Sequence, residues 1–441
     1  MSAGVHIPLI GEASPGTIVC VQLRYDYRVY PDASRCRALA RAFGCARVVW
    51  NDCLRDRKEA HAAGLPYPKS ADLSRLRITQ AKRTEGRAWL ADVSAVVLQQ
   101  ALRDLDIAYK TFFDLIRGKR KGPKVGPPRY KSKKDSRQAI RLNANAFTAC
   151  DGGTVYVAKV GRIKVKWSRP LPAVPTSLTV IRDSSGRYFM SFVVDTRPDH
   201  LPESDTEVGI DLGLTTFAVL SDGTRISSPK FLRRAEKKLK RLHKDLSRKA
   251  KGSKNREKAR IKIARQHARV ADRRRDWHHK ASTQIIRDNQ AVYVEDLAVS
   301  GIARTRLAKS VHDAGWSAFV HMLEYKAAKC GRYFGKIGRF EPTSQVCSTC
   351  GVKDGPKPLH VREWTCKACG AVHDRDDNAS KNTLAAGRAD RLNASLSARK
   401  TRRKLPARRD EAGSHQGGRA TAVGIPSRQA GERVKGPSTW R

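Results

Sequence analysis

Residues 208–223 read VGIDLGLTTFAVLSDG, two apolar runs joined at a glycine turn. The apolar runs predict two buried strands, and Asp211 lies at the end of the first. A carboxylate in such a place is costly unless a positive group meets it. The neighbouring glycines would let a substrate backbone approach closely. We therefore interpret Asp211 as a candidate functional carboxylate.

Two further acids occur in similar surroundings. Glu295 ends the short apolar run 291–294, and Asp376 opens a predicted helix at 376–382. Two strand-end carboxylates and one from a helix start can converge on a pair of Mg²⁺ ions about 4 Å apart, the arrangement that hydrolyses a phosphodiester. Hard divalent cations prefer oxygen ligands, which fits Asp and Glu. Taken singly, each acid is as easily a turn or cap residue.

The charge balance indicates a polyanionic partner. Among 441 residues, 88 are Lys or Arg and 42 are Asp or Glu, so the formal net charge is +46. This charge repels itself unless a polyanion neutralises it, and nucleic acid is the natural one. No apolar run approaches the roughly 18 residues of a membrane span, and no signal-like start is present. We expect no membrane partner, and a cytoplasmic, nucleoid-associated location in a prokaryotic cell.

Basic residues concentrate in two segments. The segment 119–134 combines Gly, Pro and Lys/Arg and reads as a phosphate-contacting loop. The segment 230–275 predicts a basic helical hairpin broken at 252–255, with one apolar face for packing. A solvated linker and a solvated charged helix are the alternatives. The candidate nucleic-acid contacts are Lys131, Lys133, Lys134, Arg233, Lys237, Lys240, Arg241, Lys244, Arg248 and Arg332.

The N-terminal half predicts a small barrel interrupted by helices. Strict alternation over 19–29 indicates a half-buried strand, and Asp32 is a plausible N-cap for the amphipathic helix that follows. A second apolar stripe predicts a helix from about Gly86 to Arg117. Short β-rich runs then follow at 154–157, 162–165, 178–182 and 188–194.

Four of the ten cysteines form two CxxC pairs, each followed by glycine: Cys347 with Cys350, and Cys366 with Cys369. Four thiolates at this spacing close a tetrahedral structural zinc site. A pair of metal-free turns is the alternative. Since four sulfurs complete the shell, we expect His360 and His373 to be surface or substrate contacts. The remaining cysteines show no disulfide framework.

The order of these blocks resembles that of the TnpB family, the OrfB-type insertion-sequence proteins, and of the similar compact type V CRISPR nucleases. The resemblance covers about residues 17–385. It rests on VGIDLGLTTFAVLSDG, VYVEDLAVSGI, TSQVCSTCG, HDRDDNASKN and, near the start, RVYPDASRCRALARAFGCARVVWN. By motif match, Asp211, Glu295 and Asp376 take the three catalytic, Mg²⁺-binding places. Asp376 is chosen over Asp374 and Asp377 because the family's most regular acid stands two residues before the Asn.

The resemblance implies an α/β multidomain protein. Its parts would be an RNase H-like RuvC nuclease domain with a zinc ribbon insertion, and a β-barrel wedge domain carrying an inserted helical recognition bundle. The implied ranges are 1–16 for an N-terminal extension, 17–31 and 125–204 for the wedge, 32–124 for the bundle, 205–342 and 371–385 for the nuclease, 343–370 for the ribbon, and 386–441 for a basic disordered tail.

The implied activity is RNA-guided, Mg²⁺-dependent cleavage of double-stranded DNA. The resemblance implies two catalytic Mg²⁺ ions, replaceable by Mn²⁺, one structural Zn²⁺, and a guide RNA from a transposon end or a CRISPR array. The protein would act as a monomer or a weak dimer on its RNA. Two alternatives remain on the same scaffold: a non-cleaving RNA-guided repressor, and a transposase or an accessory DNA-binding protein of one. All three acidic places are filled, which weighs against the repressor.

Overall fold

The computed structural model describes residues 21–404, apart from Lys121, Pro123, Asp151, Asp199 and Leu359. The described residues up to Arg391 belong to one compact unit. The expected N-terminal extension and the part of the expected tail after Lys404 lie outside the described residues. None of the described helices has the length and apolarity that a membrane span requires.

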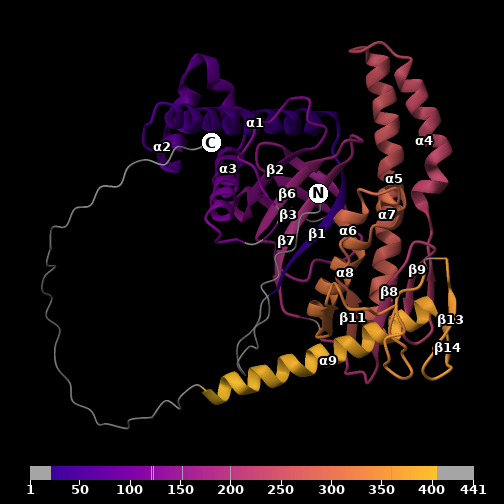
Figure 1. Ribbon diagram of the computed structural model, residues 1–441. Helices are drawn as coiled ribbons and strands as arrows, with labels where there is room; N and C mark the ends of the chain where they lie inside the picture. The colour runs from indigo at the N-terminus through magenta and orange to yellow at the C-terminus, as the bar shows by residue number, and fades with distance from the viewer. Residues whose placement is uncertain are drawn as a thin grey trace, which may run out of the picture. The chain divides into compact units, whose positions relative to one another are not determined.

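The predicted barrel is present as a seven-stranded antiparallel sheet in the order β2-β6-β7-β1-β5-β4-β3. Strands β2 and β3 follow one another in the chain yet stand at opposite edges, so the sheet curves into a nearly closed barrel (Figure 1). Tyr27, Leu142 and Phe192 are buried in its core. The strands are β1 Val21–Tyr30, β2 Gln138–Asn143, β3 Phe147–Cys150, β4 Thr154–Val157, β5 Gly161–Lys166, β6 Ser177–Arg182 and β7 Tyr188–Thr196.

A helical bundle is inserted between β1 and β2, as expected. Asp32 caps its first helix by accepting a 2.8 Å hydrogen bond from the Arg35 backbone N–H, which confirms that predicted start. The helix predicted from Gly86 begins only at Ala95, because Val93 and Ser94 are extended and interrupt it. The elements are α1 Ala33–Ala62, α2 Ser70–Ser74, the π-helix Arg75–Gln80, the 3₁₀ helices Ala81–Arg83 and Glu85–Asp92, and α3 Ala95–Ile116.

A second, five-stranded sheet has the order β10-β9-β8-β11-β12. Strand β11 lies between β8 and β12 and runs parallel to both, and its residues 291–294 are completely buried. Burial on both faces is usual for parallel strands and explains the apolar run. The strands are β8 Glu207–Leu212, β9 Thr216–Leu220, β10 Arg225–Ser227, β11 Ala291–Glu295 and β12 Tyr333–Ile337.

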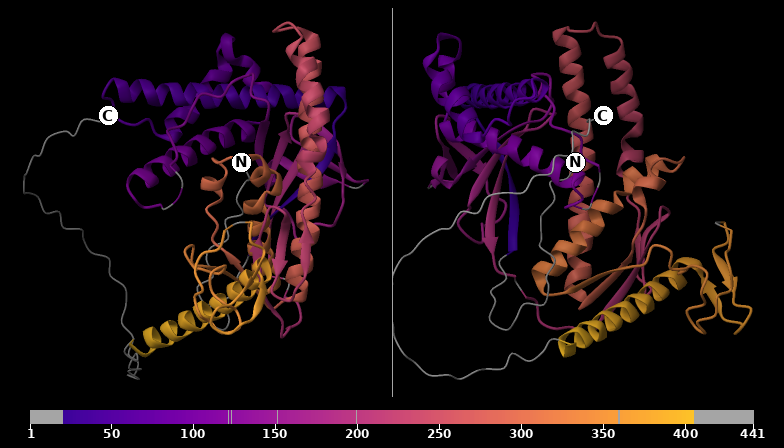
Figure 2. Two further views of the ribbon diagram at one scale, coloured as in Figure 1. Left: turned by 45° about the vertical axis from the view of Figure 1, so that its right-hand side comes forward. Right: turned by 60° about the vertical axis from the view of Figure 1, so that its left-hand side comes forward.

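Helices cover both faces of this sheet (Figures 1 and 2). One core joins Ile210 and Val294 to residues of α5 and α8. The helices are α4 Phe231–Ser247, α5 Lys254–Asp288, α6 Val299–Ile302, α7 Ala308–Ala314, α8 Trp316–Cys330 and α9 Arg375–Lys404. The predicted basic hairpin is confirmed as α4 and α5, with Ser253 capping α5.

Helix α9 packs very closely on the opposite face of the five-stranded sheet, against β8 and β11. A Cβ added at Gly209 would lie 2.3 Å from the Ser380 carbonyl oxygen, and one added at Gly387 would lie 2.2 Å from the Tyr293 ring. Only glycine permits these approaches. The residues 386–404, expected as the start of a disordered tail, continue α9 instead, because Ala, Leu, Arg and Lys favour helix.

Candidate functional site

The three predicted acids converge because of strand geometry. Side chains alternate between the faces of a strand, and Ile210 and Val294 point into the core with α5 and α8. Asp211 and Glu295 therefore share the opposite face, which α9 covers, at the carboxyl ends of the parallel strands β8 and β11. Asp376 lies in the first turn of α9. The fold thus brings carboxylates from three elements toward one place.

The electrostatics of Asp211 show that the other two acids lie near enough to act on its charge. Loss of water on burial, followed by the charges of Glu295 and Asp376, raises the pKa of Asp211 to about 8 against the opposing charges of Arg375 and Arg362. Burial also raises the pKa of Glu295. The cluster therefore repels negative charge and would bind cations.

Asp374 and Asp377, the neighbours of Asp376, are engaged elsewhere. The Asp374 carboxylate caps α9 by accepting from the backbone N–H groups of Asp376 at 2.9 Å and Asp377 at 3.0 Å. Arg225 forms ion pairs with Asp374 at 3.1 Å and Asp377 at 2.7 Å. Asp376 instead faces Arg362, whose Nη1 lies 3.2 Å from its Oδ1. These contacts favour Asp376 as the third acid of the cluster.

The four CxxC cysteines meet as predicted. Their sulfur atoms lie within 4.8 Å of one another, and among the described residues they are the only such group of three or more metal-ligating side chains. The Cys347–Cys369 and Cys350–Cys366 sulfur separations are each 3.7 Å, close to the about 3.8 Å edge of a zinc tetrahedron with 2.3 Å bonds. The cluster joins two turns beside the hairpin of β13 Glu363–Thr365 and β14 Val372–Asp374.

The expectation that His373 lies at the surface is wrong. Its ring packs on Trp364, and its Nε2 lies 3.0 Å from the Cys347 sulfur, so only 8% of the residue is exposed. It lies on β14, opposite Trp364 in the register. The side chain therefore supports the cysteine cluster from inside the ribbon.

Sequence reasoning missed one hydroxyl at the acidic cluster. Thr343 is buried and donates a 2.6 Å hydrogen bond to Oε1 of Glu295. The only sequence signal was its place at the start of the block that contains the first cysteine pair. Arg362 of the ribbon also contacts Asp376, and this contact depends on how the ribbon folds against α9.

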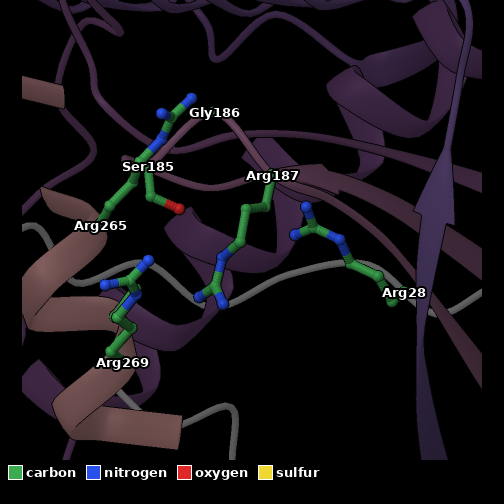
Figure 3. A pocket seen from close by; sticks show the side chains of 7 residues that line it. Arg28, Ser185, Gly186, Arg187, Arg265 and Arg269 are labelled. Atoms are coloured by element: carbon green, nitrogen blue, oxygen red, sulfur yellow. The ribbon is translucent and has the colours of Figure 1, made fainter. Parts of the chain in front are cut away.

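A basic hollow lies where the barrel meets α5. It has a volume of about 360 Å³. Its lining includes Arg28 of β1, Arg187 directly before β7, and Arg265 and Arg269 of α5. Figure 3 shows these side chains around the hollow. Arg187 pairs with Asp183 and Asp272, but among the described residues no carboxylate forms an ion pair with the other three. The Arg28 Nη1 is buried without a hydrogen-bond partner.

Two neighbouring hollows extend this basic surface. One shares Gly186 and is lined by the cations Lys133, Lys134, Arg182 and Arg260 and by the carboxylates Asp135, Asp183 and Glu257. The other shares Arg269 and lies between α4 and α5. Most of the predicted contact residues are exposed: Lys133, Lys134, Arg233, Lys237, Lys240, Arg241, Lys244 and Arg248. The hollows therefore form a series that a chain of phosphates could follow.

Two predicted contact residues make internal contacts. The Lys131 ammonium lies 3.6 Å from the Trp50 ring centroid, and its backbone pairs with Asn51. Arg332 is only 8% exposed, and its guanidinium donates to the Pro202 carbonyl at 2.6 Å and to Gln290. Lys131 is still exposed and stays a predicted nucleic-acid contact, whereas Arg332 is internal and does not belong to that surface.

The raised pKa of Asp211 predicts how stability depends on pH. In the metal-free folded protein Asp211 keeps its proton up to about pH 8, whereas an unfolded chain releases it near pH 4. The free energy of unfolding therefore falls as pH rises through this window. We expect Asp211→Asn to raise the thermal midpoint in magnesium-free buffer at pH 8. The corresponding gain in the free energy of unfolding should shrink by up to about 1.4 kcal/mol per pH unit as the pH falls toward 4. Equal midpoints at pH 8 would contradict this.

Family models match three parts of the chain. Residues 191–306 match the OrfB family of IS605-type elements, described as "Probable transposase". Residues 316–383 match the Cas12f1-like TNB domain, and residues 21–65 match a helix-turn-helix domain of the same OrfB group. The first two matches contain all three acids of the cluster and the four cysteines.

Among solved structures, the chain is similar to Cas12f1 in its complex with single-guide RNA and target DNA, with a TM-score of 0.50 and 14% identity. The similarity covers 80% of this chain and 83% of that one, and it concerns the fold alone.

Curated relatives align over most of the chain. A protein of Streptomyces pristinaespiralis named "Putative RNA-guided DNA endonuclease" is 44% identical over 84% of this chain and 90% of its own length. InsQ of Escherichia coli, with the same description, is 31% identical over 83% and 92%. "TnpB-like protein L770" of Acanthamoeba polyphaga mimivirus is 25% identical over 51% and 46%. The chain belongs to the TnpB family, the OrfB-type insertion-sequence proteins.

Proposed function

We propose that this protein is an RNA-guided, Mg²⁺-dependent DNA endonuclease whose five-stranded sheet with α5, α8 and α9 is an RuvC nuclease domain. The observation that carries the proposal is the convergence of Asp211, Glu295 and Asp376, where burial and then the charges of the other two acids raise the pKa of Asp211 to about 8. The names of the S. pristinaespiralis and E. coli relatives support the same activity. A DNA target places the protein at the nucleoid of a prokaryotic cell.

The chemistry of the donor set suits Mg²⁺, and we propose two ions there. Oxygen ligands from three separate elements, with mutually repelling charges, suit hard divalent cations. Bound there, the ions would supply an activated water and charge neutralisation at the leaving oxygen, and Mn²⁺ could replace them. Asp211 and Glu295 would hold them from the strand ends, and Asp376 from the helix start. Thr343 donates a hydrogen bond to the Glu295 carboxylate beside the cluster.

The basic hollows would hold the guide RNA. Arg28, Arg265 and Arg269 present guanidinium groups that are not neutralised by carboxylates among the described residues, and Lys133 and Lys134 continue the surface. No residue of the acidic cluster lines these hollows. A strand bound there need not be the strand that is cut. The RNA would come from a transposon end or a CRISPR array.

Two other functions use the same scaffold. A guided repressor would bind DNA without cutting, and a transposase or accessory protein would act on transposon ends. A guided repressor does not need three carboxylates that are held together at a cost in stability. The cluster therefore favours the nuclease over the repressor.

The central test is guided cleavage. The protein should copurify with a specific RNA, and changing the guide segment of that RNA should redirect the cut. Asp211→Asn, Glu295→Gln and Asp376→Asn should each lower the cleavage rate by at least about 100-fold without weakening RNA binding, because metal-bound carboxylates act on the transition state. Cleavage assays with matched RNA and DNA measure this.

Asp374→Asn is the matched control, because it makes the same chemical change at a carboxylate that caps α9 and pairs with Arg225. Asparagine also caps helices, so this variant should still cut. Equal cleavage by RNA-free protein, or binding of random cellular RNA, would overturn guidance. A cluster variant that cuts within tenfold of wild type would not belong to the metal site.

The cysteine cluster should hold one zinc ion per chain. Cys366→Ser should lose this zinc, and the ribbon should lose its local structure, since zinc binding stabilises small ribbons by about 10 kcal/mol or more. Elemental analysis and limited proteolysis measure both changes. Cys150→Ser, outside the cluster, should keep full zinc. Full zinc in Cys366→Ser would refute the four-sulfur site.

The hollow at the barrel and α5 should bind RNA phosphates. Replacing both Arg265 and Arg269 by Gln should weaken guide-RNA binding about tenfold or more. The slope of log affinity against log salt concentration should become less steep by the equivalent of roughly one to two phosphate contacts. Both side chains are exposed, so the fold should survive. Replacing the exposed Arg103 and Lys110 of α3 by Gln removes equal charge elsewhere. An equal effect of the two double variants would show only general charge attraction.

A further inference from the structure

Two asparagines of α9 hold the zinc ribbon. Asn378 donates to the Val346 carbonyl at 2.8 Å, and its own amide oxygen accepts from the Ser348 N–H at 2.8 Å. Asn382 donates to the carbonyls of Val346 and Thr343, each at 2.7 Å. Asn378 also reaches the Thr343 carbonyl at 3.3 Å. Since residues four apart share one face of a helix, the two amides form a single clamp on the chain next to the first CxxC turn.

The clamped segment reaches the acidic cluster through one side chain. The backbone of Thr343 is held by both asparagines, and its hydroxyl donates to Glu295 at 2.6 Å. Thr343 is 6% exposed and Asn378 is 1% exposed, so water competes little for these bonds. The bond supports the unprotonated form of Glu295 against the effect of burial on its pKa.

Each part of this chain of contacts has a defined place. The first CxxC turn follows Val346 directly, and its cysteines belong to the four-sulfur cluster. Helix α9, which carries the asparagines, also carries Asp376. The clamp therefore fixes the ribbon to the element that supplies one carboxylate, and Thr343 connects the ribbon to another. In metal sites, residues that hydrogen-bond to a ligand commonly change affinity or activity 10–100-fold when they are removed.

We propose that Thr343 is a positioning residue that orients Glu295 for metal binding, and that the zinc ribbon, clamped by Asn378 and Asn382, holds Thr343 in place. This inference rests on the proposed nuclease function. It gives the ribbon a role in the geometry of the acidic cluster, in addition to any contact with nucleic acid.

The test compares Thr343→Val with wild type. Valine keeps the shape of threonine and removes the hydroxyl. We expect Mn²⁺ affinity of the RNA-free protein, measured by calorimetry, to fall 10–100-fold. The Mg²⁺ concentration for half-maximal cleavage should rise by a similar factor, with guide-RNA binding and zinc content unchanged. Thr343→Ser restores a hydroxyl and should return Mn²⁺ affinity to within about threefold of wild type.

Thr383→Val is the matched control. Thr383 is equally buried, and its hydroxyl donates within α9 to the Ala379 carbonyl at 2.9 Å, away from Glu295. This variant should bind Mn²⁺ as wild type does. Asn382→Ala, which loosens the clamp on the Thr343 carbonyl, should weaken Mn²⁺ binding in the same direction as Thr343→Val while zinc is kept.

The outcomes separate this inference from the proposed function. Unchanged Mn²⁺ affinity in Thr343→Val would overturn the positioning role, even if wild type cuts DNA as proposed. Loss of zinc or of RNA binding by Thr343→Val would show that Thr343 stabilises the ribbon instead, and would also overturn it. If wild type binds Mn²⁺ and Thr343→Val does not, but no guided cutting occurs, the positioning role stands for the metal site and the nuclease proposal falls.

Discussion

Helix α9 contacts β8 at backbone range because Gly209 has no Cβ, and it accepts the Tyr293 ring of β11 because Gly387 has none. This contact sets where the first turn of α9 lies. Asp376 is in that turn, and Asp211 and Glu295 lie on the strand face that the helix covers. A larger side chain at either glycine would separate the helix from the strands. Glycine at these two positions is therefore what allows the three carboxylates to meet.

Bringing the three carboxylates together is electrostatically unfavourable, and neighbouring side chains partly offset this repulsion. Loss of water on burial, followed by repulsion from Glu295 and Asp376, raises the pKa of Asp211 to about 8. The ribbon supplies part of the response: Arg362 pairs with Asp376, and Thr343 donates to Glu295. Because Asp374 and Asp377 are held by Arg225, only Asp376 of the three neighbouring acids remains with the cluster.

The positive charge of the chain is arranged in a way that complements this acidic cluster. Hollows along α5 collect guanidinium groups from the barrel and from the α4–α5 hairpin, and they contain none of the acidic cluster residues. Binding and cutting would therefore use separate surfaces, because α5 covers one face of the five-stranded sheet and the acidic cluster lies on the other. In the proposed function, affinity for a polyanion would come from the first surface and transition-state stabilisation from the second.

Much of the fold and of the candidate site could be predicted from the local spacing of residues in the sequence alone. The strand-end acids, the CxxC pairs, the Asp32 cap and the helical hairpin are encoded by residues close together in the chain, so periodicity and spacing predicted them. Only the tertiary structure decided which long-range groups meet. It placed His373 against Cys347 and Arg332 against Pro202, and it joined Thr343 to Glu295. These contacts depend on how separate elements pack, and no local pattern records that packing.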